Sequence, residues 1–104
     1  MAVMRLTQDQ SQAIVAATAE LAGTDARVRL FGSRVRDDLL GGDIDLLVEC
    51  PRPVARPVQL AARITARLQR ALGDRRIDVL VIEPDTVLES VHRAAQADGV
   101  LLRS

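Results

Sequence analysis

Two short aliphatic runs, each carrying an aspartate near its start, constrain the fold of this chain more than any other feature. The first extends from Asp43 to Val48 and the second from Arg76 to Ile82. Both are rich in Ile, Leu and Val, bounded by turn residues and short enough to be buried strands. An ionised carboxylate buried there without a partner would cost several kcal/mol. The placement therefore predicts a compensating cation, most simply a divalent metal.

Three carboxylates are expected to converge on that cation. Side chains alternate between the faces of a strand, so Asp43 and Asp45 point the same way, and Asp78 joins them if the second run lies alongside. The three groups would repel unless hard cations lay between them. Magnesium prefers such oxygen ligands, which are usually one or two carboxylates, waters and substrate phosphates. The alternative is that the aspartates end strands and pair with nearby arginines.

A candidate phosphate-binding step precedes the first of these strands. Residues 28–31 are typical of a strand, and residues 33–38 of the first turns of a helix. Gly32 allows the backbone to approach a ligand closely, and Ser33 suits a helix N-cap whose N–H groups face an anion. Arg34 would contact phosphate or lie on a solvated helix face. A triphosphate bound here would share metal ions with the aspartates.

Apolar periodicity and capping residues predict helices around the strands. Thr7 to Gln10 is a capping box before an apolar helical period that ends at Gly23. Pro57 suits the first turn of a second helix, which would cross the sheet between the two aspartate-bearing strands. The apolar residues of that second helix recur at intervals of four: Leu60, Ile64, Leu68 and Leu72.

The C-terminal part is expected to form one more helix and a tail. Glu83 to Thr86 would start the helix, with Val87, Val91 and Ala95 on one face, and residues 100–102 would form an apolar tail. The expected order is α-β-α-β-α-β-α in a single domain, 1–104. The fold class is α/β (α+β), with a small mixed sheet of three or slightly more strands and helices packed on it.

Taken together, these motifs resemble the nucleotidyltransferases of the DNA polymerase β superfamily. The family pattern is Gly-Ser, a spacer, Asp-x-Asp and a third Asp on a neighbouring strand, which this chain matches with Gly32-Ser33, Asp43-x-Asp45 and Asp78. Each motif alone is common, but this order within strands is specific. The chain looks most like the minimal members, which are often encoded beside a HEPN-domain protein as a toxin–antitoxin pair.

Two features depart from the family pattern. The spacer between Ser33 and Asp43 has nine residues, one fewer than is common in the family, and Asp37 stands where many relatives have glycine. The pair at 41–42 is Gly-Gly, which forms tight turns easily and would absorb the shorter connection.

The resemblance implies a polymerase β palm-like fold and a specific reaction. An acceptor hydroxyl would attack the α-phosphorus of a nucleoside triphosphate, ATP by family default, and release pyrophosphate. Two magnesium ions would bind Asp43 and Asp45, and Asp78 would complete the second ion's site and serve as general base. Gly32 and Ser33 would hold the β and γ phosphates. Positioning and charge neutralisation would supply most of the rate.

Composition argues against direct contact with nucleic acid. Fourteen basic and fourteen acidic residues balance, so the chain lacks a strong overall positive field. Phe31 is the only Phe, Trp or Tyr, which leaves no platform for stacking single-stranded bases. All basic residues are arginine, and the absence of lysine excludes a P-loop and lysine-based covalent chemistry.

The sequence also predicts the compartment. Cys50 is the only cysteine and His92 the only histidine, so an internal disulfide and a Cys/His metal site are excluded. Residues 1–12 contain no apolar signal region, and no apolar run is long enough to span a bilayer. We therefore expect a cytoplasmic protein without membrane contact. Cys50 is expected to pack as a small hydrophobe and His92 to lie on a helix surface.

Three hypotheses on function stay open. A chain of 104 residues suits one catalytic domain without a separate acceptor domain, so the acceptor surface would come from a second subunit or from the acceptor itself. In the first hypothesis the chain transfers AMP to a hydroxyl of a HEPN-type toxin and is its antitoxin. In the second it is a small-molecule (antibiotic-type) nucleotidyltransferase that works as a homodimer. In the third it is a non-catalytic antitoxin that acts by binding alone in a hetero-oligomer.

Overall fold

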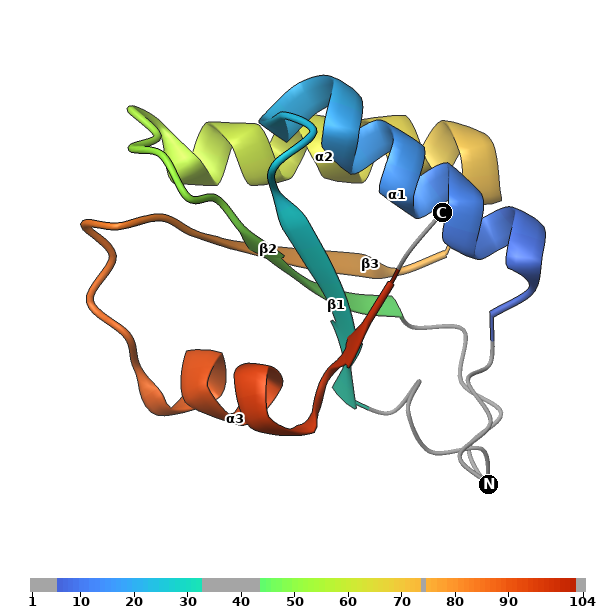
Figure 1. The fold of residues 1–104 in the computed structure, drawn as a ribbon. Helices are drawn as coiled ribbons and strands as arrows, with labels where there is room; N and C mark the ends of the chain where they lie inside the picture. Colours follow the sequence, from blue (N-terminus) through green and yellow to red (C-terminus); the bar gives the residue numbers. More distant parts are fainter. Residues whose placement is uncertain (1–5, 33–43, 74, 103–104) are drawn as a thin grey trace.

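The computed structural model describes residues 6–32, 44–73 and 75–102, which form a mixed α/β structure (Figure 1). The elements are α1 (Gln8–Ala22), β1 (Arg27–Phe31), β2 (Ile44–Glu49), α2 (Pro57–Leu72), β3 (Ile77–Ile82), α3 (Ser90–Asp98) and β4 (Val100–Leu101). Helices α1 and α2 cover one face of the sheet, and α3 lies on the other. The predicted fold class is confirmed. The helix expected at 33–38 lies outside the described residues.

The described strands form one sheet in the order β3-β2-β1-β4. Strands β2 and β3 are parallel, because α2 returns the chain across the sheet before β3 begins. Strand β1 is antiparallel to both of its neighbours, β2 and β4. The sheet is therefore mixed, as the sequence predicts.

Strand β4 corrects the prediction of an apolar tail at 100–102. Val100 and Leu101 pair with Leu30 and Arg29 of β1, and the N–H of Leu102 donates to the carbonyl oxygen of Val28 at 2.9 Å. The free edge of β1 offers unpaired backbone groups, and an apolar segment that reaches it gains hydrogen bonds as well as burial. Short strands of this kind carry little sequence signal of their own.

Helix α1 begins and ends where the sequence predicts. The side chain of Thr7 accepts from the N–H of Gln10 at 3.1 Å, and Gln10 Oε1 accepts from the N–H of Thr7 at 3.0 Å, which completes the capping box. Ile14 and Ala17 are buried against the sheet. Gly23 ends the helix with a φ of 109°, a conformation that glycine adopts without strain.

Helix α2 also follows its prediction. Pro57 occupies the first turn, and Ile64 and Leu68 are fully buried. Leu60 and Leu72 are partly buried and pack against the same core. The interval of four residues thus marks the face that α2 presents to the sheet.

The predicted start of α3 is wrong. Residues 83–86 form a turn, in which Thr86 Oγ1 accepts from the N–H of Glu83 at 2.9 Å and the N–H of Thr86 donates to the carbonyl of Glu83 at 2.9 Å. These bonds satisfy the local backbone groups, so a helix gains nothing by starting here. Val87 is 83% exposed and Val91 47% exposed, so neither belongs to a buried helix face. Ala95 is buried as predicted.

Glu89 is the N-cap of α3 and forms a reciprocal pair with His92. The side chain of Glu89 accepts from the N–H of His92, while His92 Nδ1 accepts from the N–H of Glu89 at 3.0 Å. His92 therefore has a structural role at a partly exposed position of the helix start. This arrangement replaces the usual Ser or Thr cap, which explains why the sequence pattern does not reveal it.

The two faces of the sheet carry separate apolar clusters. Ile44, Leu46 and Val48 of β2 belong to the large cluster beneath α1 and α2. Leu47, which points the other way, joins Ile82 and Ala95 beneath α3. Because Asp45 alternates with Ile44 and Leu46, it lies on the α3 side of the sheet. Within the described ranges, no helix is both long and apolar enough to cross a membrane.

Candidate functional site

The structure brings Asp45 and Asp78 together. Each is the second residue of its strand, and the parallel register of β2 and β3 pairs their Cα atoms directly. Neighbouring strands lie about 5 Å apart, and paired residues of parallel strands point to the same face. The two carboxylates therefore lie side by side on the α3 face. Asp43, Ser33 and Arg34 lie outside the described residues, so their predicted roles stay predictions.

The carboxylate pair lies at the border between an apolar patch and solvent. The next residues on the same face are Leu47 of β2, which is fully buried, and Leu80 of β3, which packs beside it. Asp45 is half-buried, whereas the side chain of Asp78 on the edge strand is 52% exposed. Asp78 is thus more exposed than Asp45, so a ligand would reach the pair most readily from the sheet edge.

Gly32 lies directly against Asp45. It follows Phe31, whose Cα pairs with that of Asp45, and its φ is 72°. A Cβ built on Gly32 would lie 2.5 Å from Asp45 Oδ2, closer than real Cβ contacts allow. Glycine is therefore favoured at this position for two reasons. It adopts the left-handed backbone without strain, and it leaves space for the carboxylate of Asp45. The contact joins the Gly-Ser motif to the Asp-x-Asp motif.

Arg76 is a charged neighbour that sequence reasoning missed. Its Nε lies 3.3 Å from Asp78 Oδ2, and its side chain is 72% exposed. The sequence analysis gave pairing between the aspartates and arginines as an alternative to metal binding, and Asp78 forms such a pair. An ion pair this exposed contributes about 0–1 kcal/mol, so a cation or phosphate can displace either partner. The sequence offered one signal, because Arg76 directly precedes β3 and stands two residues before Asp78, the spacing at which extended side chains point the same way.

The two described carboxylates, Asp45 and Asp78, are ligands of the kind that magnesium prefers. Asp45 and Asp78 supply two carboxylates, the number that magnesium commonly takes from a protein. No group of three Cys, His, Asp or Glu residues that could hold a metal is found in the described part of the chain, which does not include Asp43. The two carboxylates and the glycine beside them are suited to a cation that also binds phosphate oxygens.

Comparison with protein families tests whether this arrangement belongs to a nucleotidyltransferase or to an unrelated α/β domain. The pattern of the nucleotidyltransferase domain family matches residues 12–101, from within α1 to the end of β4. The chain belongs to the nucleotidyltransferase domain family. The predicted superfamily is confirmed, and nucleotidyl transfer is the chemistry that this membership supports. No curated protein matches the chain.

A polar network holds α3 on the face of the nucleotidyltransferase sheet that carries the aspartates. Arg29 Nε donates to Glu49 Oε1 at 2.7 Å, and Gln96 Nε2 of α3 donates to Glu49 Oε2 at 3.1 Å. Both side chains of the ion pair are mostly buried, with 22% and 21% exposed. The network lies at the end of β2 remote from Asp45, so it positions the helix without entering the site.

Cys50 supplies no reactive group to the nucleotidyltransferase. It directly follows β2 and is buried in the large apolar cluster, as the sequence predicts for a small hydrophobe. Burial raises the pKa of its thiol, and the nearby carboxylates of Asp25 and Glu83 raise it further. The thiol therefore stays protonated near neutral pH and is a poor nucleophile.

Proposed function

We propose that this nucleotidyltransferase moves AMP from ATP to a hydroxyl group of a partner protein, and that the partner is a HEPN-type toxin for which the chain is the antitoxin. The observation that carries the proposal is the side-by-side placement of Asp45 and Asp78 on paired positions of β2 and β3. Family membership supports the transfer itself. The choice of ATP as nucleotide and of a HEPN-type toxin as partner rests on the family resemblance drawn from the sequence.

In this proposal the acceptor oxygen attacks the α-phosphorus and the bond to the β-phosphate breaks, so that pyrophosphate leaves. Asp78, which is exposed on the edge strand, would accept the proton of the hydroxyl. Asp45 would bind magnesium together with Asp43. The metal, when bound, would neutralise triphosphate charge and lower the pKa of the attacking hydroxyl. Arg76, beside Asp78, is placed to pair with a phosphate oxygen once a cation occupies the carboxylate.

The exposure of Asp78 favours a protein as acceptor. A small molecule needs a concave site that buries most of its surface. Asp78 lies on the outermost strand of the described sheet with half of its side chain in solvent. A hydroxyl carried by a folded partner can reach this edge and bring its own binding surface. The described elements all belong to one sheet with its helices and include no separate acceptor-binding domain.

The experiment combines the chain, magnesium and ATP labelled at its α-phosphate with the protein encoded beside it. We expect the label on the partner and a mass increase of one AMP, located by mass spectrometry. Asp45→Asn and Asp78→Ala should each lower transfer by about a thousandfold or more, an effect of about 4 kcal/mol on the barrier. Asp98→Asn, at the exposed end of α3, is the control and should transfer normally.

Three results would contradict the proposal. If wild type and Asp78→Ala label the partner equally, Asp78 is not part of the chemistry. If the chain modifies an aminoglycoside-type hydroxyl and leaves the partner unlabelled, the small-molecule hypothesis holds. If Asp45→Asn with Asp78→Ala still protects cells from the partner, neutralisation occurs by binding alone.

A further inference from the structure

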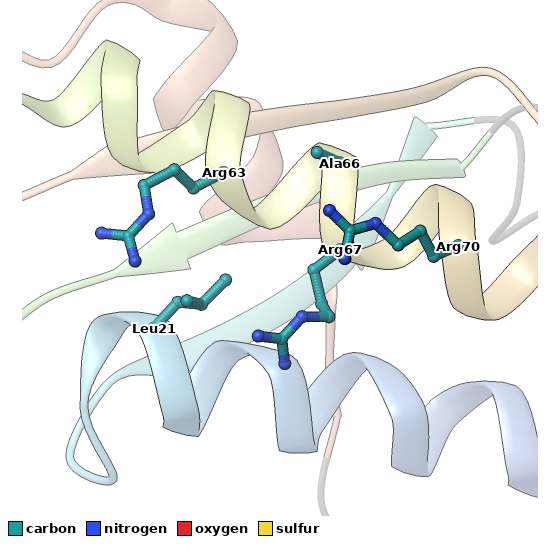
Figure 2. Close-up of a pocket in the computed structure, with 5 residues that line it drawn as sticks. All are labelled: Leu21, Arg63, Ala66, Arg67 and Arg70. Carbon is teal, nitrogen blue, oxygen red and sulfur yellow. The ribbon is translucent and has the colours of Figure 1, made fainter.

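A groove runs between α1 and α2, on the face of the molecule opposite the carboxylate pair. One part is a cavity of about 200 Å³ lined by Leu21, Ala66 and three arginines of α2, Arg63, Arg67 and Arg70 (Figure 2). A second cavity of about 410 Å³ adjoins it, because Leu21 and Arg63 line both. We refer to these two adjoining cavities together as the α1–α2 groove.

Among the described residues, the arginine end of the groove carries more positive than negative charge. Arg63, Arg67 and Arg70 follow at intervals of four and three, so they share one face of α2. Figure 2 shows Arg67 reaching towards α1 and the guanidinium of Arg70 folding back towards Arg67. Arg67 forms two hydrogen bonds with Glu20 of α1, at 2.7 and 3.2 Å. Arg63 and Arg70 have no acidic partner among the residues that the structure describes.

The surrounding sequence strengthens this imbalance. Residues 51–73 contain five arginines and no aspartate or glutamate, although the whole chain is neutral. The segment from Ile77 to Asp98 has the opposite bias, with five acidic residues and one arginine. The balanced net charge therefore conceals a basic surface on the α2 side.

The other end of the α1–α2 groove is partly apolar. Its lining includes Pro53, Val54, Ala55 and Leu60, and also the polar side chains of Arg56, Gln59 and Arg63. An occupant that fills both ends must present carboxylates or other anions to the arginines and apolar side chains to this end. Guanidinium groups bind carboxylates through paired hydrogen bonds, as Arg67 already does with Glu20.

We propose that the α1–α2 groove docks an acidic and partly apolar peptide segment of the acceptor protein. This inference rests on the proposed function, in which the acceptor is a protein. The groove lies on the opposite face of the sheet from Asp45 and Asp78, so a docked segment leaves the nucleotide site open. Holding the acceptor by a remote segment raises its effective concentration at the sheet edge. A nucleic acid fits less well, because the apolar end offers no aromatic side chain for base stacking.

Glu20 would compete with the partner for Arg67. The Arg67 guanidinium holds the pKa of Glu20 below its ordinary value, so this carboxylate is charged at neutral pH. Glu20→Gln would release Arg67 for the incoming segment. The variant should therefore bind an acidic peptide more tightly than wild type, by about two- to fivefold, the scale of one exposed ion pair.

The test uses a fluorescent synthetic peptide in which glutamate alternates with leucine, titrated against the full chain by anisotropy. Changing Arg63→Glu together with Arg70→Glu should weaken binding by about tenfold or more. The matched control changes Arg27→Glu together with Arg93→Glu, two exposed arginines outside the groove, and should bind within about twofold of wild type. A lysine–leucine peptide should not bind.

A second readout keeps the test valid if the charge-reversed chain folds poorly. In the wild-type chain, the glutamate–leucine peptide should shift the backbone amide NMR signals of Leu21 and Ala66, with little change at residues of α3. Signals that move elsewhere, or equal binding by both double variants, would overturn the proposal. Preferential binding of phosphatidylserine vesicles at the arginines, with no peptide binding, would also overturn it.

Failure of docking can be told apart from failure of the proposed function. Asp45→Asn should abolish transfer and leave peptide affinity unchanged. Arg63→Glu with Arg70→Glu should raise the KM for the acceptor protein and leave the KM for ATP unchanged. If transfer proceeds with an unchanged acceptor KM, the docking proposal is wrong and the proposed function stands. If the peptide binds but no acceptor is modified, the docking proposal stands and the proposed function is wrong.

Discussion

The two faces of the sheet are covered by helices that are held in different ways. The α1 and α2 face rests on a large cluster of fully buried aliphatic side chains, including Ile14, Leu46 and Ile64. The α3 face has a smaller cluster around Leu47 and a polar network instead. We therefore expect the α1 and α2 face to contribute most of the free energy of unfolding, whereas the α3 face leaves room for charged groups near the sheet edge.

The largest expected effect comes from the buried side chains of the α1 and α2 face. Leu46→Ala removes a fully buried side chain from the large cluster, and it should lower the free energy of unfolding by about 2–5 kcal/mol. Leu80→Ala, on the partly buried α3 side, should cost less than half as much. Urea denaturation followed by circular dichroism measures both. Equal losses would show that the two faces contribute alike.

The next effect concerns Gly32, on the face that carries the aspartates. Gly32→Ala forces a Cβ against Asp45 Oδ2 and places alanine at a φ of 72°. We expect transfer to fall about a hundredfold, because small displacements of reacting groups cost that much, and stability to fall by about 1–2 kcal/mol.

Gly73→Ala is the matched control for this change. Its φ is 89°, but a Cβ there meets nothing within 4 Å. It should cause a similar loss of stability, measured by thermal denaturation, without loss of transfer. If both alanine variants transfer equally well, the contact between Gly32 and Asp45 has no role in the chemistry.

An effect on stability, with none expected on the chemistry, comes next from the polar network that holds α3. Glu49→Ala removes the acceptor shared by Arg29 and Gln96, so two mostly buried donors lose their partner. Stability should fall by about 1–3 kcal/mol, and amide hydrogen exchange in α3 should rise while that in α2 stays unchanged. Exchange that rises equally in both helices would indicate that α3 is not held independently.

The smallest effect is the pH dependence of the Glu20–Arg67 ion pair between α1 and α2. Arg67 lowers the pKa of Glu20 from 4.5, so the pair stabilises the folded chain above that value and ceases to do so as the pH falls through the lowered pKa. Glu20→Gln should reduce stability slightly near neutral pH, and its difference from wild type should vanish once the pH has fallen through the lowered pKa. A difference that grows in acid would contradict this assignment. Thermal melts across this pH range give the measurement.

Much of the scaffold could be predicted from local sequence signals. The capping box at Thr7, the proline at residue 57 and the apolar intervals of α1 and α2 act through neighbours a few residues away, so the sequence displays them directly. The start of α3 and strand β4 were predicted wrongly. Glu89 and His92 form an uncommon cap, and β4 exists because β1 offers it a free edge.

The candidate site likewise has some features that the sequence indicated and others that only the structure shows. The strand period shows which face each aspartate takes, and the order of motifs indicates the family that the comparison then confirmed. Neither Arg76 beside Asp78 nor the fit of Gly32 against the Asp45 carboxylate follows from a motif. The first depends on the side-chain conformations at the start of β3, and the second on the distance between two neighbouring segments of the chain.

The sequence by itself therefore determined which residues are apolar, where α1 and α2 begin and which residues are candidates for the chemistry, because these properties depend on residue type and near neighbours. Only the tertiary structure decided that Asp45 lies opposite Asp78 and that the arginines of α2 border a groove with α1. Strand register and helix packing result from burying the whole apolar surface at once, which no single segment specifies.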